Sequence, residues 1–226
     1  MDARASWNTR SGEEPAEGAR GSGASAAGFT LIELIAVLMI LSILAYFLVK
    51  NVTGAQELVE EGLTRARLAE ISAALEEYAD EQGDFPLGSK LPGGGGPPNA
   101  TNLGGEALYL ALCAEGAPGF GVLDTDLCNT DGDRTPKRLP GFESQELFEL
   151  CDGWGNPIAY LHHREYERTD VYLSLDGATG EELEGAVRAR RNEKTKRFHE
   201  PSDFQLISAG VDGDFGTEDD IANFKP

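Results

Sequence analysis

The pattern of hydrophobic positions changes once along the chain, near residue 50. From Phe29 to Val49 nearly every residue is apolar, and the only charged side chain is Glu33. At about 1.5 Å per helical residue this segment would extend roughly 32 Å, which matches a membrane hydrocarbon core of about 30 Å. Apolar residues surround the expected helix on all sides, whereas a soluble amphipathic helix keeps a polar face. Residues 29–49 are therefore predicted to form a transmembrane or filament-core helix.

Helical periodicity continues beyond residue 50, but with a single apolar stripe. Apolar residues recur every three to five positions among charged ones, and the stripe includes Ile71, Leu75 and Tyr78. The stretch "EQGDFP" then supplies a glycine and a proline that stop a helix. We therefore expect residues 50–82 to be an amphipathic continuation of the first helix, and residues 83–226 to form a globular head on which the stripe packs.

The head is predicted to combine one short helix with a small sheet. Residues 106–113 read as a helix after a loop rich in glycine and proline. Three short apolar runs follow turn signals and predict strands in one antiparallel sheet: "IAYL" at 158–161, "TDVYLSLDG" at 169–177 and "FQLISAG" at 204–210. Residues 177–202 are interpreted as a charged insertion without periodicity. A long amino-terminal helix packed on a small antiparallel sheet makes the fold class α+β.

Charge narrows the possible partners. The chain holds 19 Lys and Arg against 39 Asp and Glu, a formal charge of −20, so a phosphate-binding surface would need a local basic patch. The only basic run is "VRARRNEKTKR" at residues 187–197. We interpret it as a solvated segment, and no nucleic-acid partner is expected.

Three cysteines, Cys113, Cys128 and Cys151, allow at most one disulfide within the chain. One disulfide with one spare thiol is typical of a non-cytosolic compartment. The expected pair is Cys113 with Cys128, which leaves Cys151 free.

An enzymatic function is not predicted. His162 and His163 are adjacent, so in a strand they would point to opposite faces and could not share a metal ion. No nucleophile motif appears, and the glycine-rich "PGGGGPP" lacks the lysine and Ser/Thr of a phosphate-binding loop. These patterns favour a structural protein.

Glu33 needs a positively charged partner, because a carboxylate within an apolar segment is costly. The small-residue run "GASAAG" ends at Gly28, immediately before the apolar segment and not after it as in an ordinary secretory signal. Cleavage after Gly28 would keep the helix and expose a new α-amino group on Phe29. That amine could pair with Glu33 of a neighbouring chain shifted by about one turn.

The stretch "GFTLIE", followed by an unbroken apolar run, resembles the class III signal of type IV pilins and type II secretion pseudopilins. The resemblance implies that residues 1–28 are a leader removed by a prepilin peptidase. It also implies that Phe29 is methylated and that Glu33 directs the addition of subunits to a filament.

Two acidic stretches of the sequence are candidate metal sites. In "SAGVDGDFGTEDDIANF", residues 208–224, clustered carboxylates and glycines suit a hard cation with oxygen ligands, for which calcium is the natural candidate. The residues alone leave open a solvated acidic turn. "DTDLCNTDGDR", residues 124–134, resembles a calcium loop only loosely because it lacks the distal glutamate, and we interpret it as a polar surface loop.

Four stretches in order, "YADEQGDFP", "KRLP", "WGNP" and "LISAGVDGDFGTEDDI", resemble the major pseudopilins of type II secretion systems. The resemblance implies a single-pass protein of the bacterial inner membrane with its head in the periplasm. It would form a helical filament with itself, together with minor pseudopilins and an inner-membrane assembly platform. The alternative is a surface pilin for adhesion, motility or DNA uptake. The resemblance also implies a calcium site with side-chain and carbonyl ligands: Asp212, Asp219 and Asp220, with the carbonyls of Ala209 and Thr217.

Overall fold

The computed structural model describes residues 29–91, 97–114, 120–142, 144–177 and 179–225. The chain divides into two compact units, residues 1–47 and 48–226, and each is described by itself. Helix α1 (Leu31–Gln82) contributes its first turns to the first unit and the rest to the second. The predicted leader, residues 1–28, lies outside the described residues.

The described part of the first unit is an apolar helix. Residues Leu31–Leu48 are long and apolar enough to cross a membrane by length and composition, and none of this window is buried within the chain. Large apolar side chains project on every side, among them Ile32, Leu38 and Phe47. Such a surface is stable in water only if lipid or other protein covers it.

In the second unit, α1 supplies one face of the core. Leu68, Ile71 and Leu75 are almost fully buried, and Tyr78 packs against the same cluster. The predicted packing stripe is therefore confirmed. The helix ends at Gln82, and the next residue, Gly83, has a φ of 83° while its N–H donates to the Ala79 carbonyl at 2.8 Å. Glycine adopts this left-handed conformation without strain, so the predicted stop has its usual cause.

A three-stranded antiparallel sheet packs against this half of α1. Its strands are β3 (Ala159–His162), β6 (Phe204–Ser208) and β7 (Ile221–Ala222), with β6 in the centre. Side chains alternate along β3, so that Tyr160 joins the cluster under α1 whereas Leu161 joins a second cluster on the opposite face.

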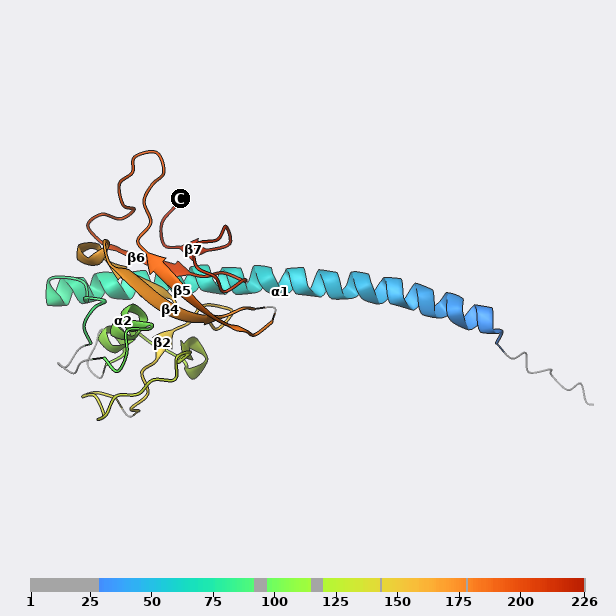
Figure 1. Cartoon of the computed structure of the whole chain (residues 1–226), viewed down its shortest axis with the longest axis horizontal. Helices are drawn as coiled ribbons and strands as arrows, with labels where there is room; N and C mark the ends of the chain where they lie inside the picture. The colour runs from blue at the N-terminus through green and yellow to red at the C-terminus, as the bar shows by residue number, and fades with distance from the viewer. Residues whose placement is uncertain (1–28, 92–96, 115–119, 143, 178, 226) are drawn as a thin grey trace, which may run out of the picture. The chain divides into compact units, whose positions relative to one another are not determined.

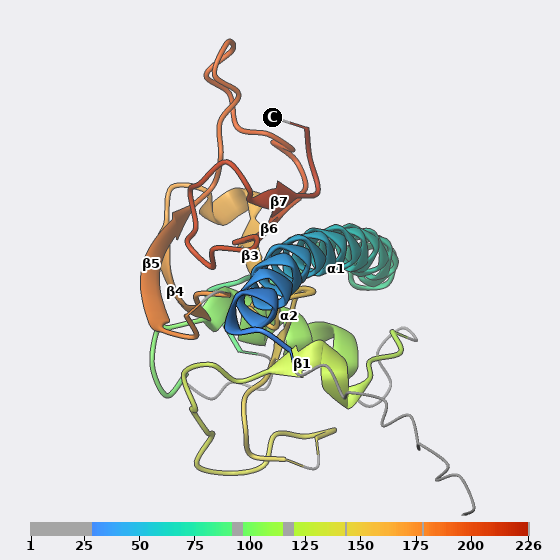
Figure 2. The same cartoon turned by 90° about the vertical axis from the view of Figure 1, so that its right-hand side faces the viewer.

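That second face is covered by an antiparallel ribbon of β4 (Thr169–Leu175) and β5 (Glu182–Arg188). Tyr172 and Val187 are its buried contributions to the second cluster. The second unit therefore has three layers: the carboxyl-terminal half of α1, the sheet of β3, β6 and β7, and the ribbon (Figures 1 and 2).

The α+β fold class is confirmed, but two details of the sequence prediction are wrong. The strands at 158–161, 169–177 and 204–210 exist, yet they lie in two different sheets. Residues 177–202, predicted to be a charged insertion between strands without periodicity, contain β5. This strand lies on the outer layer and buries only Val187 fully, so its sequence lacks the apolar alternation that marks a strand.

A helical subdomain completes the second unit. Helix α2 (Leu103–Cys113) begins three residues before its predicted start and packs on β3. Gly104 permits this approach, because a Cβ there would lie 2.5 Å from the Tyr160 carbonyl oxygen. The remaining elements are η1 (Asp124–Asp126), β1 (Leu127–Cys128), β2 (Glu149–Leu150), which pairs with β1, and η2 (His163–Glu165).

Candidate functional site

The first turn of α1 is closed by a capping box between Thr30 and Glu33. The Glu33 carboxylate accepts hydrogen bonds from the Thr30 N–H at 3.0 Å and the Thr30 hydroxyl at 2.9 Å. The Glu33 N–H donates in return to the Thr30 hydroxyl at 3.3 Å. This reciprocal pattern satisfies donors that a helix start otherwise leaves unpaired.

The capping box gives Glu33 a second role that the sequence reasoning missed, although the Thr-x-x-Glu spacing could have revealed it. All of the hydrogen bonds to the carboxylate engage Oε2, and Oε1 takes part in none that the described residues make. Phe29 is 84% exposed, so its backbone is accessible to another chain. Gly28 lies outside the described residues. The arrangement leaves one carboxylate oxygen of Glu33 for a cation supplied from outside the chain.

Asp219 organises the carboxyl-terminal acidic loop. Its Oδ2 accepts hydrogen bonds from the N–H groups of Val211 at 2.8 Å and Asp212 at 3.2 Å, and its Oδ1 accepts one from the Thr217 hydroxyl. Burial by itself would raise the pKa of Asp219, but these hydrogen bonds outweigh it and hold the pKa below its ordinary value. Asp219 is therefore ionised at neutral pH.

Asp220 lies on the other side of the same loop with a fully buried side chain. Its Oδ2 accepts a hydrogen bond from the Gly216 N–H at 2.8 Å and forms an ion pair with Arg190. Its Oδ1 is buried with no hydrogen-bond partner. One carboxylate oxygen is thus available to a cation, although the guanidinium of Arg190 already offsets part of the charge.

The five predicted calcium ligands share one loop, but their side chains do not form a closed cage. Asp212 uses its Oδ1 to accept from the Asp214 N–H at 2.9 Å. The acidic and histidine side chains that converge within 4.8 Å, among the described residues, lie elsewhere in the head. The unpartnered oxygen of Asp220 and the ionised Asp219 suit an oxygen-seeking cation, with carbonyls of Ala209 and Thr217 nearby in sequence. Calcium at this loop therefore stays a prediction.

Comparison with known families adds one finding. The prokaryotic N-terminal methylation motif matches residues 24–45, which include the capping box and most of the apolar helix. This motif indicates a type IV pilin-like protein. Neither the curated proteins nor the solved structures contain a match to the chain. The motif implies processing by a prepilin peptidase, anchoring in a membrane and assembly into filaments.

Arginines of the basic run at 187–197 make contacts within the head. Arg191 stacks over Phe198 at 3.8 Å and pairs with Glu167 at 2.7 Å, and Arg190 pairs with Asp220 as described above. Two of its arginines therefore have acidic partners in the same chain.

The structure gives Cys128 a neighbour other than the predicted partner. All three cysteines are free thiols in the structure, and the Cys113–Cys128 disulfide stays a prediction. Pairing of β1 with β2 instead brings Cys128 against Cys151. Contact with Cys151 and burial raise the pKa of Cys128, whereas contact with Cys128 lowers the pKa of Cys151. Burial raises the pKa of Cys113 to about 12.

Mild oxidation is therefore expected to link Cys128 to Cys151. The Cys151 thiolate is the better nucleophile, and each thiol gives up one proton and one electron to an added small disulfide oxidant. The bond would stabilise the head by about 3 kcal/mol. Peptide mapping without reductant should find this link in the parent chain and in Cys113→Ser. Recovery of a linked Cys113–Cys128 peptide would contradict the Cys128–Cys151 link and support the pairing predicted from the sequence.

The two adjacent histidines converge, so the reasoning that placed them on opposite faces is wrong. Strand β3 ends at His162 and η2 begins at His163, and their ring centroids lie 4.3 Å apart beside Asp84. The Nδ1 of His162 accepts a hydrogen bond from the Arg164 N–H at 3.1 Å, so the neutral ring carries its proton on Nε2, 3.6 Å from an Asp84 oxygen. A protonated Nε2 has no lone pair for a metal. This cluster ties the end of α1 to the sheet.

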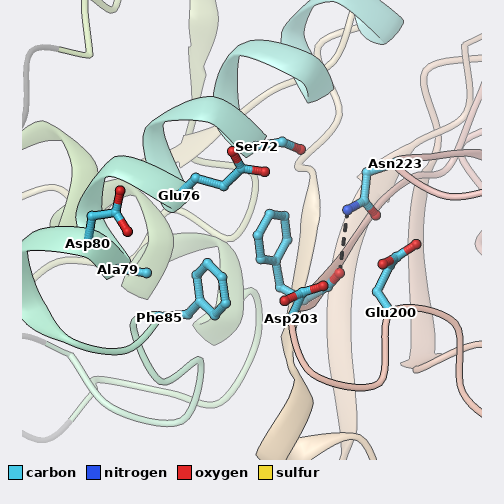
Figure 3. Close-up of a pocket in the computed structure, with 9 residues that line it drawn as sticks. Ser72, Glu76, Ala79, Asp80, Phe85, Glu200, Asp203 and Asn223 are labelled. Carbon is cyan, nitrogen blue, oxygen red and sulfur yellow. Dashed lines mark hydrogen bonds between the residues drawn. The ribbon is translucent and has the colours of Figure 1, made fainter.

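The second unit also contains a cleft of about 570 Å³ between α1 and the segment leading into β6 (Figure 3). Phe85 packs at its base against Phe204, with ring centroids 5.0 Å apart. Acidic side chains surround it: Glu76, Asp80, Glu200 and Asp203. The described lining residues include Ser72 and these four carboxylates, but no histidine, cysteine, lysine or arginine.

Proposed function

We propose that the chain is the major pseudopilin of a type II secretion system. In this role it is a structural subunit that waits in the bacterial inner membrane with its head in the periplasm. Assembly into a short periplasmic filament then promotes the export of folded proteins across the outer membrane. The observation that supports this choice over other pilin-like functions is the glycine-rich acidic loop at the carboxyl end, organised around Asp219 and closed by β7.

The amino-terminal segment supplies the assembly chemistry. Prepilin peptidase would cut after Gly28 and leave a methylated amine on Phe29. In a growing filament this amine would meet the free Oε1 of Glu33 on a neighbouring subunit, and the exposed apolar helices would cover one another. Minor pseudopilins and the inner-membrane assembly platform would be the other partners.

A surface pilin for adhesion, motility or DNA uptake is the second candidate, because the amino-terminal motif is common to both kinds of filament. The formal charge of −20 on this chain argues against a pilin that binds DNA itself. The two candidates share a processing enzyme and differ in what the filament does.

The test is removal of the chain from its host, followed by complementation. For a pseudopilin, normally secreted proteins should accumulate folded in the periplasm while surface filaments and motility are unchanged. Complementation with the parent chain should restore secretion. Loss of surface filaments with normal secretion would overturn the proposal in favour of the pilin.

Calcium binding at the carboxyl-terminal loop gives a separate prediction. Binding to the native state alone stabilises by about 2.7 kcal/mol at a hundredfold excess over Kd. The Asp219→Ala chain, purified whole in detergent, is expected to bind one calcium ion fewer than the parent chain and to gain less thermal stability from calcium. The neighbouring Glu218→Ala serves as the matched control, because Glu218 is exposed and should leave binding unchanged.

Calorimetric titration of the three chains decides the assignment. Equal stoichiometry for Asp219→Ala and the parent chain would show that the carboxyl-terminal loop is an acidic turn without calcium. Secretion measured with the same variant then tests whether this loop matters for function.

A further inference from the structure

A second group of carboxyl side chains meets inside the head, far in sequence from the carboxyl-terminal loop. Glu106 lies in the first turns of α2, Glu149 lies on β2, and Asp131 and Asp133 belong to the loop after β1. Ligand oxygens of Glu106, Asp131 and Glu149 lie within 4.8 Å of one another. We call these four residues the inner carboxylate cluster.

The two glutamates of the cluster are buried without sufficient partners. Glu106 is 1% exposed and Glu149 is 0% exposed. Both carboxylate oxygens of Glu106, Oε2 of Glu149 and Oδ1 of Asp133 are buried and accept no hydrogen bond. None of the four residues forms a salt bridge within the described part of the chain. Buried charges of this kind require a compensating positive charge.

Neighbouring amides hold the carboxylates in place and leave oxygens free. The Asn102 side chain donates to Oε1 of Glu149 at 3.0 Å, and the Asn99 side chain donates to Oδ2 of Asp131 at 2.8 Å. Asn102 adopts a left-handed backbone with φ of 57° immediately before α2, and its side-chain oxygen accepts from the Leu173 N–H at 2.9 Å. These amides therefore hold one oxygen of Glu149 and one of Asp131 in place. Because amides carry no charge, they do not neutralise the carboxylates.

Electrostatics agree with this geometry. Burial and the neighbouring aspartates raise the pKa of Glu149 to about 8, although the hydrogen bond from Asn102 opposes the shift. Burial and repulsion from Asp133, Glu149 and Asp131 raise the pKa of Glu106. The carboxyl groups of Glu106 and Asp133 lie in contact, and two ionised carboxylates are both acceptors. Two ionised carboxylates in contact repel each other, so a cation between them would stabilise both.

We propose that the inner carboxylate cluster is a second divalent-cation site and that its ligand is calcium. All of its donors are carboxylate oxygens, which favour hard cations over zinc or copper. The ligand oxygens lie within 4.8 Å of one another, so one calcium ion with bonds of about 2.3–2.6 Å can reach all of them. Magnesium usually keeps several waters and is seldom held by an all-protein set of carboxylates, so calcium is the better candidate.

The proposed site would make part of residues 124–134, interpreted above as a polar surface loop, contribute ligands to a cation. The distal glutamate of a continuous calcium loop is missing at the expected spacing in this stretch. Glu106 and Glu149 take its place from α2 and β2, which the fold brings to the loop. Calcium would join three segments that otherwise repel one another, so the site would make the folding of this subdomain depend on calcium.

The test uses the whole chain in detergent with Asp219→Ala, so that the carboxyl-terminal loop does not contribute. Titration with calcium chloride should show one bound ion per chain, and a hundredfold excess over Kd should raise the melting temperature by roughly 5–10 °C relative to chelator. Adding Glu149→Gln or Glu106→Gln should remove both effects. These variants keep the side-chain shape and lose one negative charge, so in chelator they should melt at or above the temperature of their parent.

Two further variants keep the test decisive. Asp131→Asn alters a partly exposed ligand and should weaken calcium binding at least tenfold even if a glutamate variant fails to fold. Asp124→Asn changes an exposed aspartate of η1, before β1, and should leave binding unchanged. The proposal is overturned if the Asp219→Ala chain binds no calcium. It is also overturned if calcium still stabilises Glu149→Gln and Glu106→Gln.

Protons are the competing occupant. In that case calcium should make no difference to the melting temperature. The secretion phenotype does not enter these measurements, so failure of this site and failure of the proposed function remain distinguishable.

Discussion

Replacing Glu33 with glutamine is expected to abolish filament assembly while leaving cleavage, membrane insertion and the head intact. Glutamine can still accept the hydrogen bonds from the Thr30 N–H and hydroxyl that close the first turn of α1. What it loses is the negative charge that would attract the Phe29 amine of a neighbouring subunit. Electron microscopy of sheared filaments measures assembly, and amino-terminal mass spectrometry should find Phe29 as the first residue in both chains.

The matched control is Thr30→Ala, which removes the capping hydroxyl and keeps the carboxylate. Filaments should still form from this variant, because the helix cap is local whereas the charge pair joins subunits. The opposite result, normal filaments from Glu33→Gln and none from Thr30→Ala, would assign Glu33 to helix capping. A mature chain that begins at Met1 would contradict the processing predicted from the motif.

Replacing Gly153 with alanine is expected to destabilise the head by about 2–3 kcal/mol, a loss of roughly 5–10 °C in melting temperature. Gly153 lies against the backbone of α1, where a Cβ would be 2.5 Å from the Glu60 carbonyl oxygen and 2.9 Å from the Glu60 Cα. Its N–H also donates to the buried Thr64 hydroxyl at 2.9 Å. Neither backbone can move without loosening this contact between the turn and the helix.

Gly62→Ala is the matched control, since Gly62 is an exposed helical residue with nothing within 4 Å of an added Cβ. Alanine there should stabilise α1 by up to about 1 kcal/mol. Thermal unfolding of the whole chain in detergent compares the two substitutions. A similar small gain from both would mean that the turn at Gly153 does not pack on the helix.

Helix α1 could be predicted from the sequence because its signals are local. The length of the apolar run, the glutamate four residues after Phe29 and the glycine that ends α1 at Gln82 each act within a few turns of one helix. The stripe of Ile71 and Leu75 is equally readable, because helical periodicity fixes which side chains share a face. Strand signals are equally local, so the sequence predicts where strands lie but not which strands pair.

The tertiary structure decided which strands pair and which side chains from distant segments come together. Strand β5 forms because it can pair with the edge of β4. The sequence of β5 has too few buried positions to predict a strand. The contact of Cys128 with Cys151 depends on the pairing of β1 with β2. The inner carboxylate cluster combines residues from α2, β2 and a loop that no sequence spacing relates. Local periodicity and motif spacing determined the membrane helix and its processing signal, whereas contacts between distant segments, set by packing of the whole head, decided which side chains share a site.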